Sequence, residues 1–138
     1  MEIKIAIQGI KGSFHHAVAM DYFEETVALK ECLSFDAVID AVLSGEVKQA
    51  VMALENSIAG SIIPNYALID YNDLSIVGEY NLNIHHTLMS LAGQTIEDIQ
   101  EVHSHPMALL QCKEFFSDYP HIKLIEAADT ANVAKQIA

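Results

Sequence analysis

Short apolar runs alternate with stretches of helical spacing through the first half of the chain. An apolar run closed by turn residues is typical of a buried strand, and apolar residues three and four positions apart are typical of a helix that covers a sheet. On this pattern we expect strands at 3–8, 27–32 and 49–54, with helices beginning at Phe14, at Phe35 and after residues 58–63. This alternation predicts a parallel sheet with right-handed crossovers.

The pattern changes in the second half of the chain. Residues 74–91 form one long strand-like stretch, and its halves, 75–82 and 84–91, predict a strand pair or a strand that crosses between lobes. The elements expected after it are a strand at 99–103, a helix at 106–118, a strand at 122–126 and a helix from Thr130. Ser13, Ser34 and Asp129 precede helices at positions typical of N-caps.

These elements predict an α/β chain of two small lobes. We expect the first lobe to span residues 1–79 and the second to span 80–138, with the junction near residues 78–83. The second lobe holds few strands, and residues 131–138 end in mid-helix without a terminating signal. We therefore expect the second lobe to be truncated at its C-terminus and the natural chain to continue.

Composition and charge exclude several classes of partner. Hydrophobic residues make up 51% of the 138, and the formal net charge is −12, which argues against surfaces for nucleic acid or for anionic membranes. The N-terminus enters a strand pattern at once, without a secretory signal or an apolar run of membrane length. Cys32 and Cys112 lack the spacing of a redox motif. We expect a cytoplasmic protein that binds neither nucleic acid nor membrane.

Polar clusters follow two of the predicted strands. Residues 55–57 (Glu-Asn-Ser) close the strand at 49–54, and residues 104–106 (Ser-His-Pro) close the strand at 99–103 and open the helix that contains Gln111. Ligands of open α/β sheets bind at the carboxyl ends of the strands. The two clusters therefore predict a site for a polar, anionic small molecule.

Each candidate residue also has a structural interpretation, and both stay open at this point. Ser13, after the glycine-bearing turn 9–12, caps a helix or holds an anion with the first amides of that helix. Asn56 or Ser57 caps a helix, or Asn56 donates to a ligand oxygen while Ser57 and the following amides bind an anion. Ser104 caps a helix beside a packed His105, or His105 transfers protons near neutral pH.

Metal-dependent and hydrolase chemistry find little support in the spacing of the residues. The seven histidines form neither an HExxH motif nor a Cys/His zinc set, although His103 and His105 would point to one face of a strand. No GxSxG occurs, and Cys112 lies inside a predicted helix. We expect no metal site and no serine or cysteine hydrolase.

Four segments, in order along the chain, match the motifs of one enzyme family. Residues 9–14 read Gly-Ile-Lys-Gly-Ser-Phe against Gly-Pro-x-Gly-Thr/Ser-Phe/Tyr, and residues 55–61 match Glu-Asn-Ser-x-x-Gly-Ser. Residues 104–112 match Ser-His-Pro-x-Ala-Leu-x-Gln-Cys at every fixed position, and residues 129–131 read Asp-Thr-Ala against Ser-Thr-Ala. Together these segments resemble prephenate dehydratase.

The resemblance implies a two-lobe fold like that of type II periplasmic binding proteins, with the active site in the cleft. It also implies conversion of prephenate to phenylpyruvate, water and carbon dioxide on the route to phenylalanine, without a metal or organic cofactor. By the same resemblance the site residues are the catalytic Asn56, Ser104 and Gln111 and the substrate-binding Ser13, Glu55, Ser57, His105 and Thr130. We expect the full-length protein to be a homo-oligomer, a dimer or a tetramer.

The chain also departs from the family. The Thr-Arg-Phe motif, whose threonine donates the proton in that family, does not occur, the sequence contains no arginine, and the phenylalanine-binding ACT domain is absent. We therefore expect the 138 residues alone to be catalytically inactive. The alternative function is a cytoplasmic sensor module that binds a small anion in the same two-lobe fold. A purely structural interaction domain would leave both strand-end clusters unexplained.

Overall fold

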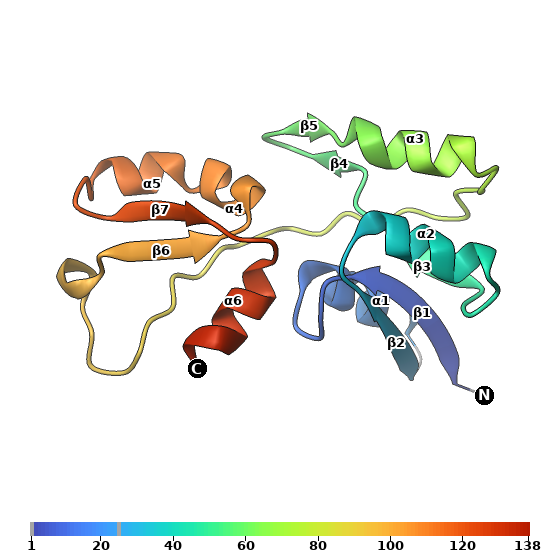
Figure 1. The fold of residues 1–138 in the computed structure, drawn as a ribbon, viewed down its shortest axis with the longest axis horizontal. Coiled ribbons are helices and arrows are strands. Elements are labelled where there is room, and N and C mark those ends of the chain that lie inside the picture. Colours follow the sequence, from blue (N-terminus) through green and yellow to red (C-terminus); the bar gives the residue numbers. More distant parts are fainter. Residues whose placement is uncertain (1, 25) are drawn as a thin grey trace. The chain divides into compact units, whose positions relative to one another are not determined.

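The computed structural model describes residues 2–24 and 26–138, and the chain divides into two compact units. The first unit is Met1–Asn83 and the second is Ile84–Ala138. Both units combine small sheets with helices, so the predicted α/β class is confirmed (Figure 1). No helix in the described residues is long and apolar enough to cross a membrane.

The first unit is built around a three-stranded parallel sheet of order β2-β1-β3. Its strands are β1 (Ile3–Gln8), β2 (Val27–Cys32) and β3 (Gln49–Val51). The central strand β1 has a neighbour on each side, and its residues Ile5, Ala6 and Ile7 are fully buried. The predicted parallel sheet is confirmed, although its third strand ends earlier than expected.

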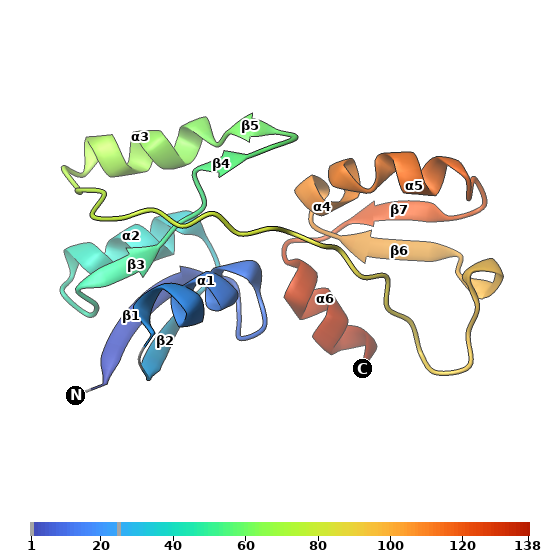
Figure 2. The same cartoon turned by 180° about the vertical axis from the view of Figure 1, so that it is seen from behind.

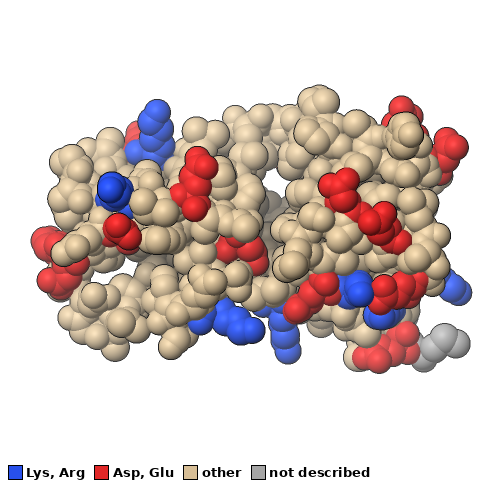
Figure 3. All heavy atoms as spheres, in the orientation of Figure 1, with Lys and Arg blue, Asp and Glu red and all other residues tan. Residues whose placement is uncertain are grey.

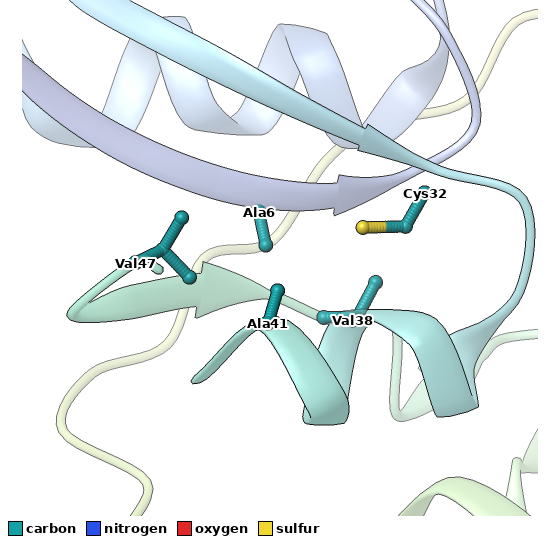
Figure 4. Packing of buried hydrophobic residues seen from close by; sticks show 5 residues of the cluster. All are labelled: Ala6, Cys32, Val38, Ala41 and Val47. Carbon is teal, nitrogen blue, oxygen red and sulfur yellow. The ribbon is translucent and has the colours of Figure 1, made fainter. Parts of the chain in front are cut away.

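Two helices, α1 (Phe14–Phe23) and α2 (Phe35–Leu43), pack against this sheet. Successive side chains of a strand point to opposite faces, so Ile5 and Ile7 pack on the α1 side and Ala6 packs on the α2 side. Figure 4 shows the small cluster on the α2 side, formed by Ala6, Cys32, Val38, Ala41 and Val47. The core of this unit is therefore divided by the sheet into two layers.

The predicted helix caps are confirmed. The Ser13 hydroxyl accepts a hydrogen bond from the His16 amide at 3.3 Å, and the Ser34 hydroxyl accepts one from the Ala37 amide at 3.1 Å. In the second unit, the Asp129 carboxylate accepts the amide of Asn132 at 3.3 Å. Each of these bonds satisfies an amide that has no partner inside its own helix.

A short hairpin follows β3. Its strands, β4 (Glu55–Asn56) and β5 (Gly60–Ser61), are antiparallel, and they lead into α3 (Ile63–Tyr71). Pro64 lies in the first turn of α3, where its missing N–H costs no hydrogen bond. The cluster at residues 55–57 therefore lies on a hairpin that precedes α3.

The predicted strand pair at 75–82 and 84–91 is wrong. Within the described chain these residues belong to no strand, and Figures 1 and 2 show them as an extended trace that leaves α3. A strand requires hydrogen bonds to a neighbouring strand, whereas apolar alternation only indicates an extended backbone. At its start the stretch is held on α1, where the Tyr80 hydroxyl donates to Asp21 at 3.1 Å.

The second unit is smaller and contains one parallel strand pair, β6 (Glu101–Ser104) and β7 (Lys123–Glu126). Its helices are η1 (Ile96–Asp98), α4 (Pro106–Gln111), α5 (Lys113–Ser117) and α6 (Thr130–Ile137). The single helix expected at 106–118 is two helices that meet at Cys112, whose backbone (φ −98°, ψ 4°) departs from α-helical values. Gln111 is thereby the last residue of α4.

Candidate functional site

Ser13 lies at the carboxyl end of β1, where the chain turns into α1. The turn needs glycine, because Gly9 and Gly12 have φ values of 99° and 96°, in the left-handed region. The Gly12 amide donates to Nδ1 of His16 at 3.0 Å, and Ser13 is 9% exposed. Ser13 acts as a helix cap, as the structural interpretation predicted, and its hydroxyl proton is not consumed by that bond.

The backbone N–H and the backbone carbonyl of Ala53, just before the hairpin, both form hydrogen bonds with side chains. Its amide donates to Nε2 of His15 at 3.1 Å, and its carbonyl accepts from the side chain of Asn65 at 2.8 Å. Asn65 is only 2% exposed. These bonds replace strand partners that β3 lacks beyond Val51, and they fix the start of the hairpin to α1 and α3.

Asn56 organises the hairpin turn. Its Oδ1 atom accepts the amides of Ile58 at 2.9 Å and Ala59 at 3.1 Å. The interpretation that Asn56 or Ser57 caps a helix is therefore wrong, because Ser57 lies exposed in the turn between β4 and β5, and the next helix begins at Ile63, at the end of residues 58–63 as expected. With its oxygen engaged, Asn56 has its Nδ2 hydrogens left to offer to a ligand.

Glu55 is exposed and is paired with two hydroxyl groups. Its carboxylate accepts the hydroxyl of Ser61 at 3.1 Å and the hydroxyl of Tyr66 at 2.5 Å. The hydrogen bond to Glu55 raises the pKa of the Tyr66 phenol above its ordinary value, since it stabilises the protonated form. Glu55 therefore joins β4, β5 and α3, which is a scaffold role for this carboxylate.

Ser104 and Thr130 lie together in the second unit. Ser104 ends β6 and is 8% exposed, and its hydroxyl oxygen lies 2.8 Å from that of Thr130, the first residue of α6. One of the two hydroxyls donates to the other, so one hydroxyl proton of the pair remains for a further acceptor. The structure thus brings two of the predicted site residues into direct contact across 26 positions of sequence.

His105 does not have the environment that the sequence predicted. Its Nδ1 atom accepts the amide of Met107 at 3.1 Å, so His105, and not Ser104, caps α4. The ring is exposed, which contradicts the interpretation of a capping Ser104 beside a packed His105. Because Nδ1 accepts, the neutral ring carries its proton on Nε2.

A cavity of about 930 Å³ lies in the second unit and has Ser104, Gln111 and Thr130 in its wall. Much of the remaining wall is apolar and comes from β6, α4, α6 and residues 84–91. At one side Oε1 of Gln111 hydrogen-bonds Nε2 of His86. Three predicted site residues therefore share one hollow, and His105 does not line it.

The thiol of Cys112 also lines this cavity, next to Gln111. Burial raises the pKa of the Cys112 thiol, because the charged thiolate loses its hydration. A protonated thiol is a poor nucleophile. In residues 2–24 and 26–138, no three His, Cys, Asp or Glu side chains gather closely enough to hold a metal ion.

The eight predicted residues thus fall into two groups. The first unit carries Ser13, Glu55, Asn56 and Ser57, and the second carries Ser104, His105, Gln111 and Thr130. A single site built from both groups stays a prediction. Sequence reasoning missed the residues that hold these groups in place: His15, Asn65, Tyr66 and His86. Only Asn65, a polar residue at the start of an apolar helix, left a local signal.

Comparison with known proteins covers nearly the whole chain. The family model described as prephenate dehydratase matches residues 5–138. Arogenate dehydratase/prephenate dehydratase 2, chloroplastic, of Arabidopsis thaliana is 39% identical over 137 residues, covering 99% of this chain and 35% of that protein. A bifunctional chorismate mutase/prephenate dehydratase of Enterobacter agglomerans is 36% identical, covering 98% of this chain and 36% of that protein.

Among solved structures, that of GqqA, described as a novel type of quorum quenching acylase, is similar. It has a TM-score of 0.77 and 29% sequence identity, and the match covers 97% of this chain and 48% of that one. The chain spans about a third of the length of the curated relatives that it matches. The similarity in sequence and in fold therefore concerns only that part of those proteins.

Proposed function

The chain belongs to the prephenate dehydratase family, and on that premise we propose that the protein carrying it converts prephenate to phenylpyruvate. In this reaction the bond between the ring and its carboxylate breaks, and the electron pair enters the ring. The ring hydroxyl leaves with a proton as water, carbon dioxide is released, and the ring becomes aromatic. The protein must therefore hold two carboxylates and direct one proton to the leaving hydroxyl.

The observation that carries the proposal is the way the two site amides are held. Oδ1 of Asn56 and Oε1 of Gln111 are both engaged within the protein, so each amide has N–H groups left for a ligand. The Ser104–Thr130 pair supplies a further hydroxyl proton. These N–H and O–H donors can bind carboxylates and a leaving hydroxyl, and the sequence contains no arginine that could do so. Donors that are already in position before the reaction lower its activation barrier effectively.

We also propose that the two units are the lobes of a type II periplasmic-binding-protein fold and that prephenate is bound between them. Two features support this arrangement. Each unit has its own parallel strands, and in each unit polar residues follow the carboxyl end of a strand. The family resemblance of the four motifs, two of which fall in each unit, supports it as well.

The 138 residues hold no Thr-Arg-Phe motif, and we propose that the proton donor lies outside them. The isolated chain then binds substrate groups but does not complete the reaction. We further propose that the full-length protein is a cytoplasmic homo-oligomer, a dimer or a tetramer. Large exposed apolar side chains, among them Leu33, Tyr71 and Val77, support association, and light scattering on the full-length protein measures it.

The decisive experiment compares the full-length protein, its Gln111→Leu variant and the isolated 138 residues. Arogenate is tested beside prephenate, because arogenate dehydratases are among the relatives. We expect turnover by the full-length protein, none by the 138 residues, and a loss of about a hundredfold in kcat/KM for Gln111→Leu, the size of one hydrogen bond to a charged group. Gln136→Leu, on the exposed end of α6, is the matched control.

Full-length protein that turns over neither compound would overturn the proposal. Calorimetry then identifies the alternative, because a sensor of small anions would bind prephenate without consuming it. Full activity in Gln111→Leu would instead remove Gln111 from the site while leaving the reaction in place.

A further inference from the structure

His86 lies in the extended stretch that opens the second unit, and Gln111 lies at the end of α4. Both side chains are half-buried, and both line the cavity that contains Ser104 and Thr130. Nε2 of His86 hydrogen-bonds Oε1 of Gln111. This contact joins His86, which lies outside the four family motifs, to Gln111, which is a candidate catalytic residue.

The direction of the contact follows from the atoms that meet, Nε2 of His86 and Oε1 of Gln111. A carbonyl oxygen can only accept, so His86 donates from a protonated Nε2. A primary amide can otherwise rotate by half a turn and exchange its oxygen for its NH2 group. A ring with its hydrogen on Nε2 therefore holds the oxygen end of the Gln111 amide and leaves the NH2 end for a ligand.

We propose that His86 is a positioning residue for Gln111, which it holds so that the amide offers N–H groups, and not its oxygen, to an anionic substrate. The inference rests on the proposed function, since it assigns Gln111 a negatively charged ligand. The orientation matters in this cavity, because Asp98 and Glu101 also line it and no arginine in the sequence could offset a misplaced oxygen. A reversed amide would turn a carbonyl oxygen towards a carboxylate.

The test uses the full-length protein and four variants: His86→Phe, His86→Gln, Gln111→Leu and the double variant of His86→Phe with Gln111→Leu. His86→Phe keeps a ring but has no N–H, whereas His86→Gln carries an amide N–H at a similar distance from the backbone. We expect His86→Phe to raise KM on the order of tenfold with a smaller change in kcat, and His86→Gln to restore most of the loss. In a Gln111→Leu background, His86→Phe should have little further effect, because the partner is gone.

His121→Phe is the matched control, since His121 is an exposed histidine of the same unit that does not line the cavity. Thermal unfolding checks that each variant is folded. Equal KM values for wild type and His86→Phe, equal losses in His86→Phe and His86→Gln, or additive losses in the double variant would each overturn the inference.

A second readout separates this inference from the proposed function. The side-chain amide signal of Gln111 in a ¹H–¹⁵N spectrum, assigned by its loss in Gln111→Leu, should move in His86→Phe and return towards its position in His86→Gln. An unmoved signal refutes the inference even if wild-type protein is active. Wild-type protein that is inactive while the signal moves as expected refutes the proposed function alone.

Discussion

Asn56 and Gln111 share one property at the scale of single residues: the protein engages the oxygen of each side-chain amide. For Asn56 the partners are two amides of its own turn, and for Gln111 the partner is an imidazole at a distant position in the sequence. In both cases folding leaves the donor end for other acceptors. In both residues the amide oxygen is bound within the protein, and we propose that the amide nitrogen binds the ligand.

Asn56→Asp separates the two uses of this side chain. A carboxylate still accepts the amides of Ile58 and Ala59, so the turn should persist and the unfolding midpoint should change little. The donor becomes a negatively charged oxygen, which repels a carboxylate ligand, and we expect kcat/KM of the full-length protein to fall at least about a hundredfold. Steady-state kinetics and thermal unfolding measure the two effects.

Asn81→Asp adds the same charge at an exposed position in the extended stretch and serves as the control. If Asn56→Asp and Asn81→Asp gave the same activity, Asn56 would have no role as a donor.

The hairpin that carries residues 55–57 depends on bonds from other elements. β4 and β5 have two residues each, too few to be stable alone. Their position comes from the bonds of Ala53 to α1 and α3 and from the contacts of Glu55 with Ser61 and Tyr66. The order of the cluster at residues 55–57 therefore depends on these contacts.

Asn65→Leu tests this dependence. The substitution leaves the Ala53 carbonyl without its donor inside the protein, and we expect a loss of about 1–3 kcal/mol in the free energy of unfolding. The hairpin amides should also exchange faster with solvent. Denaturant unfolding and hydrogen exchange of the folded chain measure these changes.

Asn72→Leu is the control for that experiment, because Asn72 donates to Leu68 within its own helix end. It should cost less and should leave exchange in residues 55–61 unchanged. Equal exchange in both variants would show that Asn65 does not hold the hairpin.

Local and distant interactions explain what could be predicted at this scale. The caps at Ser13, Ser34 and Asp129 were predictable, since each bonds an amide three residues ahead. Pairing between strands is not local, so the apolar alternation of residues 74–91 could not reveal that they lack a partner strand in the described chain. The same reason hid the contact of Ser104 with Thr130. The position of residues 104–106 at the end of a strand could be predicted from periodicity, whereas β3 ends at Val51 and residues 55–57 lie on the hairpin that follows it.

Charge is the dominant property of the whole molecule. The formal net charge is −12, and on the face in Figure 3 the acidic side chains are spread widely, while the lysines stand in a few places. Two lysines of the chain, Lys4 and Lys30, lie 3.0 Å each from the same carboxylate oxygen of Glu46. Such exposed pairs contribute little stability, and they leave little positive surface for a polyanion.

We therefore expect the 138 residues to bind neither duplex DNA nor vesicles that contain anionic lipid, at physiological salt concentration. The long-range repulsion between like charges is the physical reason. Fluorescence anisotropy with labelled DNA and co-sedimentation with vesicles measure binding, and a basic protein of similar size is the positive control. Binding that weakens steeply with added salt would contradict this expectation.

In the described residues, three imidazole rings accept hydrogen bonds from backbone amides, for which carbonyl oxygens are the usual acceptors. Rings of His15, His16 and His105 accept backbone amides of Ala53, Gly12 and Met107. A ring nitrogen accepts only when it carries no hydrogen, so in each neutral ring the other nitrogen carries the hydrogen. These bonds order three places: the turn before α1, the segment that enters the hairpin and the first turn of α4. Replacing one of these histidines with an apolar residue therefore leaves a backbone N–H without its acceptor in the protein.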